Sequence, residues 1–221
     1  MLSSDYGNNS ATHRARVYRL GLTLSTTLRL ENSPLPEMTP EPSWPLDKTI
    51  VLVGLMGAGK TSVGRKLAEI MDFSFIDADE EIIKAAGCSI EDIFQKYGEE
   101  AFRDVEERVI SRLLQEGPMI LATGGGAFMN SRIRALIATN GISVWLRAEL
   151  DVLVRRTRRR GGRPLLKDKN HKDTLEALIR ERGPVYAESN IVVDSTDEGA
   201  GATAKLVMNA LGDKIQPGQE S

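Results

Sequence analysis

A phosphate-binding loop is the most specific chemical feature of this 221-residue chain. Residues 54–61 read GLMGAGKT, which matches the pattern G-x-x-x-x-G-K-[ST]. A β-branched apolar run, residues 49–53, precedes the loop, and a helix-forming stretch to about residue 71 follows it. Strand, glycine-rich turn and helix in this order are the context in which the pattern binds nucleotide phosphates. The alternative is a flexible glycine turn with an exposed lysine. It would not explain why an apolar run precedes the loop and a helix-forming stretch follows it.

Each position of the loop has a chemical reason. The glycines let successive backbone N–H groups turn toward the phosphates, and the helix that begins near Gly59 adds its positive end. Lys60 can reach the β- and γ-phosphates, and the Thr61 hydroxyl can ligate Mg²⁺. The loop therefore predicts that ATP is bound with Mg²⁺ as cofactor, by residues Gly57, Ala58, Gly59, Lys60, Thr61 and Ser62.

Two carboxylates follow the second apolar run, residues 73–77. On extended backbone, Asp77 and Asp79 would point the same way into the crevice at the carboxyl end of a parallel sheet, where ligands bind. Asp77 would then lie near Thr61 as a second candidate metal ligand, directly or through water. Asp79 could accept the proton of a substrate hydroxyl during phosphoryl transfer. A helix N-cap at Asp79 followed by acids in the first turn remains an open alternative.

Composition excludes several other classes. Lys and Arg total 29 against 31 Asp and Glu, a net charge of -2, which is less basic than a nucleic-acid or anionic-membrane binder. The apolar runs are strand-sized, so we expect a soluble protein without membrane partners. The single cysteine, Cys88, excludes an internal disulfide and indicates a reducing compartment. The D-x-x-G and N-K-x-D strings of GTP switches do not occur, so a compact small-molecule kinase fits best.

Short apolar runs alternate with amphipathic stretches after residue 47, which predicts one α/β domain with a parallel sheet and helices on both faces. The expected strands are residues 49–53, 73–77, 119–122, 142–146 and 190–193. The expected helices after the one that follows the loop are residues 82–86, 90–97, 99–115, 131–138, 149–158, 172–187 and 198–211. This is a doubly wound, five-stranded fold of the P-loop NTPase type, with a domain at 47–212 and a frayed tail at 213–221.

Residues 1–46 differ from the rest in carrying Ser, Thr, Asn, four arginines and a series of prolines. The prolines fix φ and remove N–H donors, so we expect a disordered extension and linker. An extension of a bacterial cytoplasmic protein is the favoured interpretation. An organellar transit peptide in residues 1–30 is the alternative, because such peptides are Arg-bearing and poor in acids.

Six motifs in order resemble the shikimate kinases over about residues 48–194. Besides the phosphate loop and the Asp77–Asp79 pair, they are FRDVE at 102–106, TGGG at 123–126, RPLL at 163–166 and RGPVY at 182–186. The resemblance implies a monomer that phosphorylates the 3-hydroxyl of shikimate with ATP, in aromatic amino-acid biosynthesis, and a strand order 2-3-1-4-5. It also implies a shikimate-binding segment near residues 79–107 and a lid near residues 158–173.

The resemblance assigns roles to further residues. By this resemblance, shikimate would be held by residues Asp79, Arg103, Gly125, Gly126 and Arg182. We expect Glu106 and Gly124 to bind the substrate as well. Physical chemistry agrees, because a guanidinium fork is the best partner for the carboxylate of the substrate. Glu106, three residues after Arg103, could orient it or meet a ring hydroxyl. Arg163 would act from the lid on the phosphates, as a catalytic and ATP-binding residue, and Arg156 would lie beside the adenine.

Two rival functions remain open at this point. A related P-loop kinase acting on gluconate or a nucleoside monophosphate would share the phosphate loop. A non-catalytic nucleotide-binding module would share it too, but would release no ADP in response to an acceptor. The basic cluster at residues 155–163 could suggest a nucleic-acid surface, yet the acidic net charge and the lack of interleaved aromatic residues argue against it.

Overall fold

The computed structural model describes residues 48–158 and 171–215. The N-terminal extension, Arg163 and most of the predicted lid lie outside the described residues. None of the helices in the described ranges combines the length and the apolar composition that crossing a bilayer requires.

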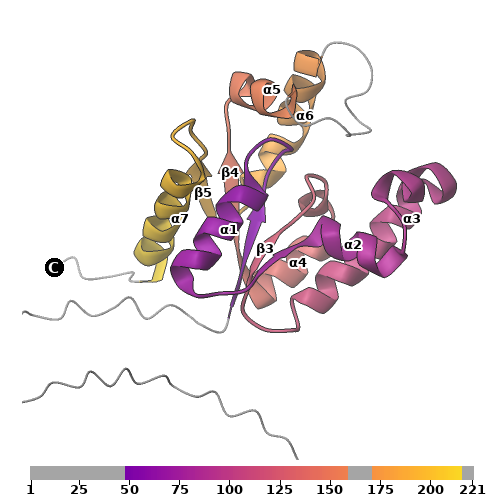
Figure 1. The fold of residues 1–221 in the computed structure, drawn as a ribbon, viewed down its shortest axis with the longest axis horizontal. Coiled ribbons are helices and arrows are strands. Elements are labelled where there is room, and N and C mark those ends of the chain that lie inside the picture. Colours follow the sequence, from indigo (N-terminus) through magenta and orange to yellow (C-terminus); the bar gives the residue numbers. More distant parts are fainter. Residues whose placement is uncertain (1–47, 159–170, 216–221) are drawn as a thin grey trace, which may run out of the picture. The chain divides into compact units, whose positions relative to one another are not determined.

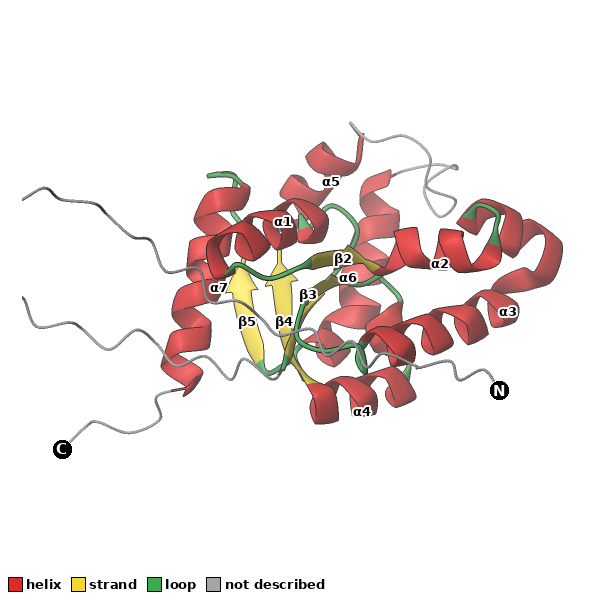
Figure 2. Ribbon diagram, turned by 60° about the horizontal axis from the view of Figure 1, so that its bottom comes forward, coloured by secondary structure: helices red, strands yellow, loops and turns green. Residues whose placement is uncertain are grey.

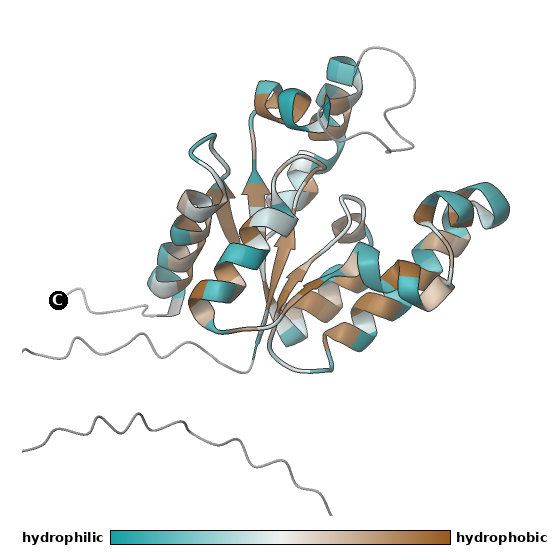
Figure 3. Ribbon diagram, viewed as in Figure 1, coloured by the Kyte–Doolittle hydropathy of each residue, from teal (hydrophilic) through white to brown (hydrophobic). Residues whose placement is uncertain are grey.

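Five parallel strands form the sheet, in the order β2-β3-β1-β4-β5. This confirms both the predicted fold class and the strand order. The strands are β1 (Thr49–Val53), β2 (Phe75–Asp77), β3 (Ile120–Ala122), β4 (Gly141–Arg147) and β5 (Ile191–Asp194). Every residue of the central strand β1 is buried, which is why its sequence is continuously apolar or β-branched rather than alternating. Apolar residues concentrate in the strands, as Figure 3 shows.

Helices cover both faces of the sheet (Figures 1 and 2). Helices α1 and α7 lie side by side over one face, and α3 and α4 lie together over the other. The helices are α1 (Lys60–Met71), α2 (Ala78–Ala86), α3 (Ile90–Leu113), α4 (Ser131–Asn140), α5 (Leu150–Arg158), α6 (His171–Tyr186) and α7 (Ala200–Ile215), with a 3₁₀ turn η1 (Ala127–Met129). Because α7 continues to Ile215, the domain boundary predicted at residue 212 falls inside a helix.

Helix α3 is kinked at Gly98, which has non-helical dihedral angles (φ 82°, ψ 177°). The two helices predicted at 90–97 and 99–115 correspond to the segments on either side of this kink. A capping box at Ser89 and Asp92 starts the first segment. The second segment carries Arg103 and Glu106, so the kink separates the tip of α3 from the residues expected to bind substrate.

Candidate active site

The phosphate loop joins β1 to the N-terminus of α1. Gly59 is the N-cap of α1 with φ 99°, a left-handed conformation that favours glycine. It offers no side-chain cap, and the first turn of α1 contains no acid, so the positive end of this helix is available to an anion. The Lys60 ammonium donates to the carbonyls of Gly54 (2.7 Å) and Leu55 (3.0 Å), which folds it over the loop.

Thr61 and Asp77 lie together, as expected for a metal site. The Thr61 hydroxyl donates to Oδ2 of Asp77 at 2.9 Å. No cluster of three or more His, Cys, Asp or Glu residues that could hold an ion occurs in the described part of the chain. A hydroxyl and one carboxylate suit Mg²⁺, a hard cation that is usually bound by one or two carboxylates together with waters and phosphate oxygens. Thr61 and Asp77 therefore fit Mg²⁺ better than a metal whose ligands all come from protein side chains.

The backbone around Asp79 corrects one prediction. Helix α2 already begins at Ala78, so Asp79 lies in its first turn and not on extended backbone. Asp77 is the N-cap, and its Oδ1 accepts the backbone N–H of Asp79 at 3.1 Å. The alternative of an N-cap was correct in kind, but the cap is Asp77, two residues before Asp79. The backbone N–H groups in the first turn of a helix have no partner within the helix. The Asp77 carboxylate accepts one of them, which favours a helix that begins directly after Asp77.

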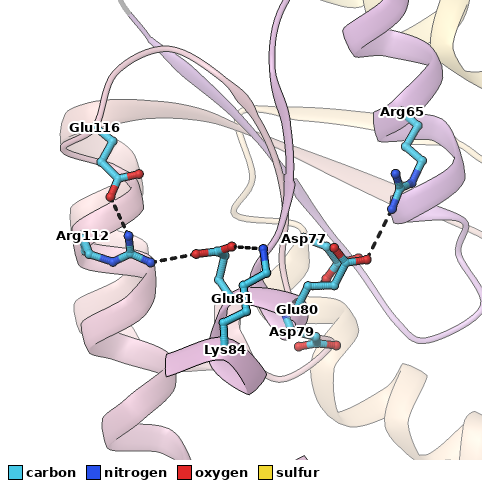
Figure 4. Close-up of polar contacts among 8 residues, drawn as sticks. All are labelled: Arg65, Asp77, Asp79, Glu80, Glu81, Lys84, Arg112 and Glu116. Atoms are coloured by element: carbon cyan, nitrogen blue, oxygen red, sulfur yellow. Dashed lines mark hydrogen bonds and ion pairs between the residues drawn. The ribbon is translucent and has the colours of Figure 1, made fainter. Parts of the chain in front are cut away.

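The first turn of α2 is tied to two other helices, as Figure 4 shows. Glu80 pairs with Arg65 on α1 (3.3 Å), and Glu81 pairs with Arg112 on α3 (2.9 Å). Such exposed pairs contribute only about 0.2–1 kcal/mol each. Their main effect is to orient the first turn of α2, because two consecutive acids link this turn to α1 on one side and to α3 on the other. Asp79, in the same turn, lines a cavity.

Arg103 and Glu106 form a half-buried ion pair on α3. Nη1 of Arg103 donates to Oε2 of Glu106 at 2.7 Å, and Nη2 donates to Glu99 at 3.0 Å. The Glu106 side chain is only 1% exposed. Burial raises the pKa of Glu106 above its ordinary value, while Arg103 opposes the shift. Within the described residues, Oε1 of Glu106 has no hydrogen-bond partner, so this oxygen can accept from a ligand hydroxyl.

The triple glycine lies directly beneath these side chains. A Cβ at Gly126 would stand 2.7 Å from both Nη atoms of Arg103, so only glycine lets the guanidinium rest on the backbone. A Cβ at Gly124 would stand 3.0 Å from carboxylate oxygens of both Asp79 and Glu106. These glycines therefore bring Arg103, Glu106 and Asp79 close to one turn.

One cavity of about 970 Å³ connects the phosphate loop with this cluster. Its walls include the following sequence-predicted residues: Gly57, Gly59, Lys60, Thr61, Ser62, Asp77, Asp79, Arg103, Glu106, Gly124, Gly125, Gly126, Arg156 and Arg182. Ala58 is the exception among the described ones. It is buried, and its N–H donates to the Leu55 carbonyl (3.2 Å) inside the loop.

Arg156 forms the opposite end of the cavity together with the loop after β5. Its Nη1 donates to Ser195 Oγ at 3.0 Å, and its Nη2 donates to the Thr196 carbonyl at 2.5 Å. Ser195 and Asp197 line the cavity. The loop after β5 therefore lies beside Arg156, next to the phosphate loop.

Two aromatic residues of the cavity wall were missed in the sequence. The rings of Phe94 and Phe102 lie 4.7 Å apart, on the two sides of the Gly98 kink, and both line the cavity with Ile83 and Ile90. The apolar spacing of the helix was the only signal in the sequence, and it does not distinguish a cavity wall from the core. Together these side chains add an apolar part to a cavity that is otherwise lined by charged and polar groups, which suits a small ring that carries polar groups on part of its edge.

The comparisons with known proteins agree with each other. A sequence profile of one family, shikimate kinase, matches residues 56–212. The chain is 49% identical to a shikimate kinase of Mesorhizobium japonicum over 164 residues, 74% of this chain and 81% of that protein. It is 50% identical to a shikimate kinase of Caulobacter vibrioides over 164 residues, 74% of this chain and 82% of that protein. Among solved structures, it resembles a shikimate kinase from Acinetobacter baumannii in complex with shikimate, with a TM-score of 0.74 and 36% identity, covering 77% of this chain and 96% of that one.

Proposed function

The chain belongs to the shikimate kinase family, and we propose that it transfers the γ-phosphoryl group of ATP to the 3-hydroxyl of shikimate. The products are shikimate 3-phosphate and ADP, in a step of chorismate and aromatic amino-acid biosynthesis. The observation that carries the proposal is the single cavity in which the phosphate loop faces a pair of arginines placed over a triple glycine. A phosphate donor and a carboxylate-bearing acceptor can both bind there.

On the nucleotide side, Lys60 and the loop amides would bind the β- and γ-phosphates, with Gly57, Gly59 and Ser62 beside them. Thr61 and Asp77 would hold Mg²⁺, which when bound neutralises charge on the phosphate oxygens. Arg156 and the loop at Ser195 would flank the adenine. Arg163, which lies outside the described residues, is proposed from the resemblance to act on the phosphates.

On the acceptor side, the Arg103 and Arg182 guanidinium groups would hold the carboxylate of shikimate. Glu106 would orient Arg103 and offer its second oxygen to a ring hydroxyl. Asp79 would accept the proton of the reacting hydroxyl as the P–O bond forms. Positioning and charge stabilisation carry this kind of transfer, so we propose no covalent enzyme intermediate.

We further propose that the enzyme works as a cytoplasmic monomer and that residues 1–46 take no part in the reaction. The match of the family's sequence profile to residues 56–212, which lie after this extension, supports the second point. A transit-peptide role for residues 1–30 predicts cleavage and import when the chain is expressed in a eukaryotic cell, whereas the favoured interpretation predicts neither.

The product identifies the reaction. Purified chain is incubated with ATP, Mg²⁺ and shikimate, and the product is analysed by mass spectrometry and by ³¹P–¹H correlation NMR. We expect one added phosphate, coupled to the proton on carbon 3 of the ring. Phosphate on another ring carbon would contradict the proposed placement of Asp79, and no phosphorylated product would contradict the proposed function.

A further inference from the structure

Tyr186, the last residue of α6, is enclosed between the two halves of the site. It is 1% exposed, and its ring stacks with Trp145 (centroids 5.7 Å apart) and Phe128 (6.4 Å). Phe128 lies in η1, directly after the triple glycine. Trp145 lies in β4 against the phosphate loop, since a Cβ at Gly54 would stand 3.2 Å from its ring. The Tyr186 ring therefore connects the loop that would hold the acid with the loop that would hold phosphate.

The Tyr186 hydroxyl is held by a backbone carbonyl of the triple-glycine turn. It donates to the carbonyl oxygen of Gly125, which also accepts from Nη1 of Arg182 at 3.1 Å. Tyr186 and Arg182 are four residues apart on α6, so two donors on one helix face converge on one carbonyl. Burial raises the pKa of Tyr186 to about 12, so the hydroxyl keeps its proton over the working range of an enzyme.

The direction of the Gly125 carbonyl also determines the direction of the Gly126 N–H, because both belong to one peptide plane. No cis peptide bond occurs in the described residues, and in a planar trans peptide the N–H points away from the C=O. With the Gly125 carbonyl held toward α6, the Gly126 N–H is directed to the other side of the turn. Gly126 lines the cavity, and no hydrogen bond from the N–H of Gly125 or Gly126 is found among the described residues. This turn thus presents unused donors to a ligand.

We propose that Tyr186 is a positioning residue for the acceptor acid, acting through the Gly125 carbonyl. It sets the direction of the Gly126 N–H, and because Nη1 of Arg182 donates to the same carbonyl, Nη2 of Arg182 is left to the carboxylate. Gly125 also lies close to the phosphate loop, since a Cβ at this position would stand 3.5 Å from the Met56 amide nitrogen. The inference rests on the proposed function, since it assigns to Tyr186 a role in binding shikimate.

Tyr186→Phe removes one oxygen and keeps the ring stack, so it separates positioning from packing. We expect kcat/KM for shikimate to fall by about 10-fold, the loss of roughly one well-placed hydrogen bond, while KM for ATP changes by less than about two-fold. The matched control is Tyr97→Phe, a hydroxyl deletion at a 68%-exposed ring outside the cavity, which should leave both constants unchanged. If Tyr186 has a purely structural role, Tyr186→Phe should lower the melting temperature without a selective fall in kcat/KM for shikimate. That result would overturn the inference.

A ligand-free measurement gives an independent test. Loss of the hydrogen bond to the Gly125 carbonyl should move the ¹⁵N resonance of Gly126 in Tyr186→Phe and leave it in place in Tyr97→Phe. An unmoved Gly126 signal would overturn the inference whatever the kinetics show. In the wild-type chain, a slowly exchanging Tyr186 hydroxyl proton is expected, and rapid exchange would contradict the proposed bond even if the variant failed to fold. If wild-type protein phosphorylates a different acid, the proposed function fails, whereas these NMR results would still stand.

Discussion

Removing the Arg103 guanidinium tests the most unusual electrostatic feature of the site. In Arg103→Ala, Glu106, which is 1% exposed in the unchanged chain, loses its 2.7 Å partner. Breaking a fully buried pair costs about 3–5 kcal/mol of folding free energy. Arg103 is itself 30% exposed, so we expect a smaller loss, about 2–4 kcal/mol near neutral pH. We also expect kcat/KM for shikimate to fall by about 30-fold or more, which corresponds to about 2 kcal/mol or more.

The loss of stability should depend on pH in a defined direction. Burial already raises the pKa of Glu106 above its ordinary 4.5, and Arg103 is the main group that lowers it. Without Arg103 the folded-state pKa rises further. A carboxyl group with a raised folded-state pKa stabilises the fold fully below its unfolded pKa, and this contribution is lost as pH rises through the folded value. The deficit of Arg103→Ala should therefore be small near pH 5 and large near pH 8.

Urea unfolding at these two pH values measures the effect. The matched control is Arg180→Ala, because Arg180 is 81% exposed and pairs with an exposed Glu176 on α6. We expect it to change the free energy of unfolding by less than about 0.5 kcal/mol at either pH. Adding Glu106→Gln to Arg103→Ala should restore stability near pH 8, since the buried charge is then gone. Equal deficits at both pH values, or no restoration in the double variant, would refute the reasoning.

Three further changes have defined outcomes. Lys60→Met should lower kcat by about 100-fold or more with an unchanged melting curve, and near-normal kcat would contradict its assigned phosphate contact. Gly126→Ala places a Cβ 2.7 Å from the Arg103 nitrogens and should lower kcat/KM for shikimate by about 10-fold, whereas Gly201→Ala in α7, where a Cβ meets nothing, should not. A chain lacking residues 1–46 should keep kcat/KM within about two-fold in steady-state assays, and a folded but inactive product would show that the extension contributes to the site.

Local chemistry explains which parts of the site could be predicted. The phosphate loop was recognisable because its glycines, lysine and threonine act within one strand, turn and helix. The contact between Thr61 and Asp77 was also predicted, because parallel strands bring their carboxyl ends to one edge. The strand order came from the family resemblance, since periodicity does not state which strands are neighbours.

The features of the site that the sequence did not predict arise from competition between local and tertiary interactions. Two neighbouring carboxylates compete for the N-cap of α2, and Asp77 takes it while remaining within 2.9 Å of Thr61. The wall formed by Phe94 and Phe102 depends on how α3 bends at Gly98 and packs against α2, which spacing alone does not reveal. The contact between helices α5 and α6, in which His171 Nε2 lies 2.8 Å from Thr157 Oγ1, depends on tertiary packing in the same way.

ADP release with a panel of acceptors tests the central claim most directly. Purified chain is supplied with ATP and Mg²⁺, and ADP is measured with shikimate, gluconate, a nucleoside monophosphate or no acceptor. We predict rapid release with shikimate and background rates with the other three. Equal release in all four, or a clear preference for gluconate or the nucleotide, would contradict a cavity in which Arg103 and Arg182 select a cyclic hydroxy acid beside the phosphate loop.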